Sequence, residues 1–85
     1  MDTTDEAYGD AVNAALANLL EHAKLDSGMT YPAIAAKTGI SVITLKRLFD
    51  DQRPMKLSQF FTIAAALDQE PLTLMSQAEE AAKSA

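Results

Sequence analysis

Cysteine is absent from this chain of 85 residues, and histidine occurs once, as His22. Without cysteine the protein forms no disulfide and no thiolate metal site, and a single histidine excludes any site that needs two. No apolar run approaches the roughly 18 residues that cross a bilayer, and the acidic start has no cationic segment of the kind that begins a signal peptide. We therefore expect a soluble cytoplasmic protein with no metal, no cofactor and no membrane segment.

Residues that catalysis requires are equally sparse. The three glycines do not have the spacing of a phosphate-binding loop. Asp2, Asp5 and Glu6 lie near the terminus, where carboxylates favour a helix N-terminus over a metal. His22 has no facing acid, because its neighbour Glu21 points elsewhere on a helix. Since no nucleophile, base and oxyanion-binding group come together, we predict that the protein is not an enzyme.

Charge is distributed unevenly along the chain. Residues 1–28 carry six acids and one base, residues 29–57 five bases and two acids, and residues 58–85 four acids and one base. Charges farther apart than about 8 Å are largely screened at physiological salt, so the local balance matters more than the acidic total. The cationic middle favours a nucleic-acid partner, and ordinary surface solubility is the alternative explanation.

Apolar residues recur at helical spacing, and no segment alternates apolar and polar residues as a strand does. Capping and helix-ending residues divide this pattern into five expected helices. With no linker or repeat between them, they predict one compact all-α domain over residues 1–85. The expected helices are one over 4–26 with Thr3 as N-cap, a short one after the N-cap Thr30, one over 42–49 after the N-cap Ser41, one over about 57–67, and one that opens at Pro71 and frays from about residue 80.

Residues 30–49 have the spacing of a helix-turn-helix, in which two short helices share a tight turn. Gly39 supplies the positive φ that such a turn requires. The small side chain of Ala35 lets the two helices approach each other. Leu45 and Leu48 share one face of the second helix, where we expect them to fix it to the core.

From about Leu20 to Met75 the chain resembles the phage repressor and Cro family, the Xre-like or lambda repressor-like helix-turn-helix proteins. The family has five helices, and its members bind operator DNA, usually as two-fold dimers. Many repress phage or plasmid promoters. The resemblance implies the same fold and the same partner, double-stranded operator DNA. The residues that carry it are Gly28-Met29-Thr30, Ile34-Ala35, Gly39-Ile40-Ser41, Leu45, Leu48 and Ile63-Ala64-x-x-Leu67.

Three positions depart from the family's pattern. Phe49 stands where an acidic residue commonly pairs with a base on the first helix, such as Lys24. Asp51 stands where glycine is common, and Tyr31 stands where glutamine is often found. These departures concern the fine geometry of DNA contact rather than the fold.

The helix over 42–49 is the candidate DNA-reading element. Its outward face offers Val42, Ile43, Lys46 and Arg47 as base contacts. Arg47 can donate two hydrogen bonds to guanine, and Lys46 can reach guanine or phosphate. Val42 and Ile43 can contact thymine methyl groups. The alternatives are a solvated helix face for the two cations and core packing for the two β-branched residues.

Candidate phosphate contacts surround this helix. The second helix opens where free N–H groups and the helix dipole favour an anion. Lys37 is more simply explained as a solvent-exposed residue that contributes to solubility. Asp50 and Asp51 would repel a phosphate unless their side chains face away from it or pair with Arg53. The predicted phosphate contacts are Thr30, Tyr31, Ser41, Thr44, Gln52, Arg53 and Lys56.

A single recognition helix reads few base pairs, and a two-fold dimer places two of them about 34 Å apart. The fifth helix is the candidate dimer interface, through Leu72, Leu74, Met75 and Ala78. These side chains could instead close the core of the monomer. So small a dimer would be weak and could form only on DNA.

Two classes of function follow. The first is a sequence-specific double-stranded DNA-binding transcription regulator, a phage-type repressor or Cro-like protein that binds operator DNA through residues 42–49 and then associates with the nucleoid. The second is a protein-interaction regulator on the same fold, like an antitoxin or anti-repressor, with little or no DNA binding of its own. The basic middle fits the first class, and the acidic ends fit the second. No small-molecule ligand is evident.

Overall fold

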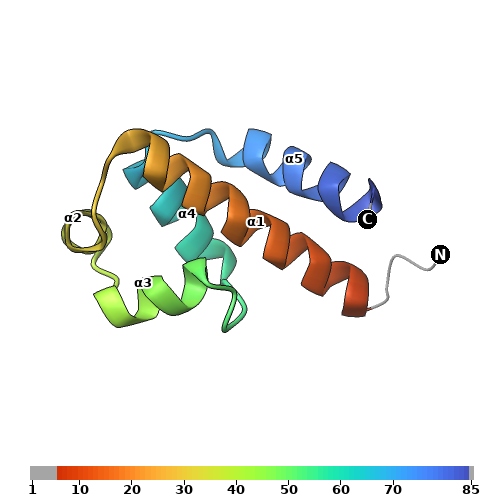
Figure 1. The fold of residues 1–85 in the computed structure, drawn as a ribbon, viewed down its shortest axis with the longest axis horizontal. Helices are drawn as coiled ribbons and strands as arrows, with labels where there is room; N and C mark the ends of the chain where they lie inside the picture. Colours follow the sequence, from red (N-terminus) through yellow and green to blue (C-terminus); the bar gives the residue numbers. More distant parts are fainter. Residues whose placement is uncertain (1–5, 85) are drawn as a thin grey trace.

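Five helices make up the part of the protein that the computed structural model describes, residues 6–84 (Figure 1). No strand occurs among these residues, so the prediction of a compact all-α domain is confirmed for them. The expected N-cap Thr3 lies outside the described residues. No helix within the described range is long and apolar enough to cross a membrane. The helices are α1 (Glu6–Ser27), α2 (Tyr31–Thr38), α3 (Val42–Phe49), α4 (Leu57–Ala66) and α5 (Pro71–Ser84).

The ends of α2 and α3 follow local signals in the sequence. The Thr30 hydroxyl accepts a hydrogen bond from the backbone N–H of Ala33 at 3.2 Å, so this predicted N-cap is confirmed. The Ser41 hydroxyl accepts from the backbone N–H of Thr44 at 3.2 Å and caps α3 in the same way. Between the two helices Gly39 has a φ of 78°, the left-handed conformation expected of the turn.

The last two helices differ slightly from their expected bounds. α4 ends at Ala66, one residue before the predicted end. α5 continues to Ser84, past residue 80 where we expected fraying. Its last turn is supported by Lys83 Nζ, which lies 3.7 Å from Glu79 Oε2, and by the Ser84 hydroxyl, which donates to the Glu80 carbonyl at 2.9 Å.

Every helix contributes at least one buried side chain to the core. In α4, Ile63 and Ala64 are buried. Of the two adjacent phenylalanines of this helix, Phe60 is buried, whereas Phe61 keeps 40% of its surface exposed. Burying a side chain of this size stabilises the fold by about 1.5–3 kcal/mol. The largest fully buried side chains are Leu20, Ile34, Leu45, Leu48, Phe60 and Ile63.

α1 packs against α5 and α3, whereas α2 packs against α3 and α4. α5 runs back alongside α1, and α3 lies on the other side of it (Figure 1). The helix expected to read DNA and the helix expected to mediate dimerisation therefore belong to different faces of the molecule.

Candidate nucleic-acid interface

α3 is buried on one side and open on the other. Leu45 and Leu48 are fully buried, as their spacing predicts. Ile43 keeps 65% of its surface exposed, and Lys46 and Arg47 are exposed as well. The structure thus brings three of the four predicted base-contact residues to one open helix face. Such a face is free to meet a partner without disturbing the core.

The N-terminus of α3 contains the fourth predicted base contact and two predicted phosphate contacts. Val42 and Thr44 are half-buried, so packing takes up part of both side chains. Ser41 is exposed, but its hydroxyl is already engaged within the protein. It accepts the capping hydrogen bond from the Thr44 N–H and donates one to Thr44 Oγ1 at 3.0 Å. An anion here would meet the remaining N–H groups of the first turn.

Tyr31 connects three helices. Its ring meets the ring of Phe49 edge-on, with centroids 5.6 Å apart and planes at 87°. Lys24 Nζ of α1 lies 4.5 Å from the centre of the Tyr31 ring, and Lys46 Nζ of α3 lies 5.8 Å from it. Cations this close to an aromatic face are attracted to it. Tyr31, Phe49, Lys24 and Lys46 therefore form an aromatic and cationic cluster. It lies where the family resemblance implies an acid at position 49 that pairs with Lys24.

The electrostatic surroundings of Tyr31 bear on its predicted phosphate contact. Burial raises the pKa of the Tyr31 hydroxyl above its ordinary value of 10.0, and the negative charges of Glu21 and Asp50 raise it further. The hydroxyl is protonated at neutral pH, and its hydrogen bond to the Glu21 carboxylate also contributes to the raised pKa. The same two carboxylates would repel a phosphate that approached it. The phosphate contact of Tyr31 stays a prediction.

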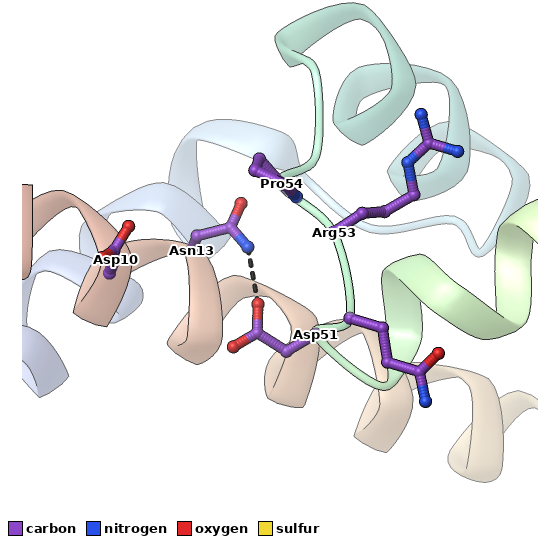
Figure 2. Close-up of a pocket in the computed structure, with 6 residues that line it drawn as sticks. Asp10, Asn13, Asp51, Arg53 and Pro54 are labelled. Carbon is purple, nitrogen blue, oxygen red and sulfur yellow. Dashed lines mark hydrogen bonds between the residues drawn. The ribbon is translucent and has the colours of Figure 1, made fainter.

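The loop between α3 and α4 presents exposed polar side chains. Gln52, Arg53 and Lys56, all predicted phosphate contacts, are exposed there. Asp51 has a φ of 56°, in the left-handed region that suits glycine and that aspartate tolerates. The side chain of Asp51 is turned toward α1, where its Oδ1 accepts a hydrogen bond from Asn13 Nδ2 at 2.7 Å (Figure 2).

Sequence reasoning did not identify Asn13. The signal for it was its place at helical spacing with Leu16 and Leu20, which puts a polar side chain on the inward side of α1. A polar residue in such a position needs a hydrogen-bond partner. Its partners lie in the loop after α3, so a local pattern could not have named them.

Basic side chains around α3 are available to a partner. Within residues 6–84 one ion pair has a nitrogen–oxygen distance below 4.0 Å, and it joins Lys83 and Glu79 of α5. Neither Asp50 nor Asp51 forms such a pair with Arg53 in the described part of the chain. No described carboxylate therefore neutralises, at this distance, the cations Lys46, Arg47, Arg53 and Lys56.

The predicted dimer residues of α5 fall into two groups. Leu74 and Ala78 are buried within the chain, so they close the core of the monomer, which was the alternative for these positions. Leu72 and Met75 remain 68% and 36% exposed. Of the four predicted interface residues, Leu72 and Met75 are therefore the two that a second copy could contact.

The described residues contain no group of three or more histidine, cysteine, aspartate or glutamate side chains placed to hold a metal ion. His22 is exposed on α1. Comparison of the chain with protein-family models, with curated proteins and with solved structures gave no match.

Proposed function

We propose that this chain is a sequence-specific double-stranded DNA-binding transcription regulator of the phage repressor and Cro type. The observation that carries the proposal is the open face of α3, where Ile43, Lys46 and Arg47 are exposed on a helix whose other side is buried. α2 precedes it across a left-handed turn at Gly39. A short helix supported in this way suits docking in the major groove.

The chemistry of the open face fits the edges of base pairs. The major groove is about 12 Å wide and admits an α-helix. Arg47 donates two hydrogen bonds to O6 and N7 of a guanine, and Ile43 contacts a thymine methyl group. Lys46 reaches a guanine or a phosphate. Arg53 and Lys56 in the following loop bind phosphates, which positions α3 without reading sequence.

The acidic total of the chain does not oppose this function. Glu79 and Glu80 belong to α5, on the opposite side of α1 from α3 (Figure 1). Asp51 is turned toward α1 by its hydrogen bond to Asn13. Asp50 and Glu21 do lie near Tyr31. Exposed charges are screened beyond about 8 Å at physiological salt, so the local balance decides, and the four exposed cations Lys46, Arg47, Arg53 and Lys56 outnumber these two carboxylates.

Two such chains on one operator would read more sequence than one. Leu72 and Met75 are the exposed apolar side chains of α5 that support a two-fold contact. In that arrangement the half-sites lie about 10 base pairs apart. The interface is small, so we expect the dimer to form on DNA rather than in its absence.

The test is selection of bound sequences from a library of random DNA duplexes, followed by binding of the winner and of an unselected duplex over a range of salt. We expect one sequence to be enriched and preferred. We also expect the logarithm of the affinity to fall against the logarithm of the salt concentration with a slope of about −3 per chain, from Lys46, Arg53 and Lys56. No enrichment together with no salt-dependent binding would contradict the proposal.

A protein-interaction regulator is the second candidate, and one observation favours it. α4 has no charged side chain, yet it exposes 63% of Leu57 and 40% of Phe61, one helical turn apart. Exposed apolar side chains at such spacing are typical of a contact with another protein. This second candidate would be supported if the selection from random duplexes enriches no sequence.

A further inference from the structure

Asn13 of α1 holds the loop between α3 and α4 at two points. Its Nδ2 donates to Oδ1 of Asp51 at 2.7 Å, as Figure 2 shows, and its Oδ1 accepts from the backbone N–H of Met55 at 3.0 Å. These partners lie 38 and 42 residues further along the chain. A single side chain thus fastens both ends of the segment 51–55 to α1.

Only an amide in this orientation satisfies both partners. If the amide of Asn13 were reversed, its oxygen would face the Asp51 carboxylate and its NH₂ group would face the Met55 N–H. An apolar residue at position 13 would leave the N–H of half-buried Met55 without this acceptor, and an unsatisfied buried donor is costly.

The clamp formed by Asn13, Asp51 and Met55 separates opposite charges within the loop. Figure 2 shows the Asp51 carboxylate directed at Asn13, while the side chain of Arg53 extends away from this contact. The acid that would repel a phosphate therefore faces α1, and the base that would attract one faces outward. The hydrogen bonds also hold the loop before any partner binds, so less ordering remains to be done on binding.

We propose that Asn13 is a positioning residue for DNA backbone contact, which presents Gln52 and Arg53 to phosphates and holds Asp51 away from them. This inference rests on the proposed function, and it adds a residue of α1 to an interface otherwise formed by α2, α3 and the loop. Asn13 itself does not touch the DNA. It acts through the loop.

The first test compares Asn13→Ala with Asn18→Ala, a matched change at an exposed asparagine of the same helix. Asn13→Ala should bind selected and random duplexes alike about three- to tenfold more weakly. Its salt slope should be shallower by about 1, because Arg53 no longer meets its phosphate. Asn18→Ala should match the wild type. Wild-type affinity and slope in Asn13→Ala would overturn the inference.

The second test exchanges the two partners. Asn13→Asp alone places two carboxylates against each other and should weaken binding. Adding Asp51→Asn restores a donor and an acceptor, with the same net charge as the wild type, and leaves an acceptor for the Met55 N–H. The double variant should recover wild-type affinity to within about twofold. If it binds as weakly as Asn13→Asp, the clamp is not the cause.

Amide hydrogen exchange of Met55 separates this inference from the proposed function, because it needs no DNA. The Met55 amide should exchange about tenfold faster in Asn13→Ala than in the wild type, while the amides of α5 keep their rates. Unchanged Met55 exchange would overturn the clamp alone. A wild-type protein that binds no duplex would overturn the proposed function and, with it, the role of Asn13 in DNA contact.

Discussion

Lys24 of α1 and Lys46 of α3 approach the same aromatic ring, that of Tyr31, at 4.5 and 5.8 Å from its centre. Their neighbour Arg47 is different, since its side chain makes no hydrogen bond, ion pair or ring contact within the described residues. Of the two cations on the open face of α3, Lys46 is therefore partly engaged within the protein. Arg47 is the one free to form a two-bond contact with a base.

The aromatic contact between α2 and α3 should contribute to stability. Phe49 is buried, so Phe49→Ala should lower the free energy of unfolding by about 3–5 kcal/mol. Phe49→Leu keeps most of the apolar burial and should cost less, mainly the edge-on contact with Tyr31, worth about 0.5–1.5 kcal/mol. Unfolding in denaturant measures both. An unchanged midpoint for Phe49→Ala would show that position 49 does not belong to the core.

Tyr31 should make stability depend on alkaline pH. Because its pKa is raised above 10.0 in the folded protein, the folded state holds the phenolic proton more tightly than the unfolded chain. This group leaves the free energy of unfolding unchanged below pH 10 and lowers it as the pH rises further. Tyr31→Phe should remove that loss, whereas Tyr8→Phe should retain it. Denaturant midpoints at about pH 8 and pH 11 test this, and equal losses in the wild type and Tyr31→Phe would contradict it.

The two sides of α3 should respond differently to truncation. Leu45 is fully buried, so Leu45→Ala should cost about 2–5 kcal/mol, a large part of the stability of so small a domain. Ile43→Ala, on the open face, should change stability by less than about 0.5 kcal/mol. Thermal melting of both variants decides the orientation of the helix. Similar melting temperatures for the two would mean that its inward face is misassigned.

Two substitutions in α5 should distinguish a residue of the monomer core from a residue of the dimer contact. Leu74→Ala should destabilise the monomer, because Leu74 is buried. Leu72→Ser should leave the melting temperature nearly unchanged and should reduce cooperativity on a two-site duplex. Sedimentation and binding isotherms on duplexes with one and two half-sites measure this. A Hill slope of one for the wild type on the two-site duplex would contradict a dimer through α5.

Much of the fold could be predicted from short-range chemistry. Thr30, Ser41 and Gly39 act on backbone groups within four residues, so the sequence names both the residue and its effect. The inward direction of Leu45 and Leu48 follows from helical period alone. These signals place the open face of α3 correctly without tertiary information.

Contacts between distant segments could not be predicted in this way. The hydrogen bond from Asn13 to Asp51 joins residues 38 positions apart, and no local pattern gives its distance. The burial of Leu74 and Ala78 depends on how α5 packs on α1, whereas helical spacing alone favoured a dimer interface for them. Likewise, periodicity could not decide which of the adjacent Phe60 and Phe61 enters the core.

The most direct measurement of DNA reading by α3 is the affinity of wild type, Arg47→Ala and Lys56→Ala for the selected duplex and for a random duplex at two salt concentrations. Arg47→Ala should lose about 1–3 kcal/mol on the selected duplex and much less on the random one. Lys56→Ala should weaken both nearly equally and lower the salt slope by about 1. Equal losses on both duplexes for Arg47→Ala would contradict base reading by α3.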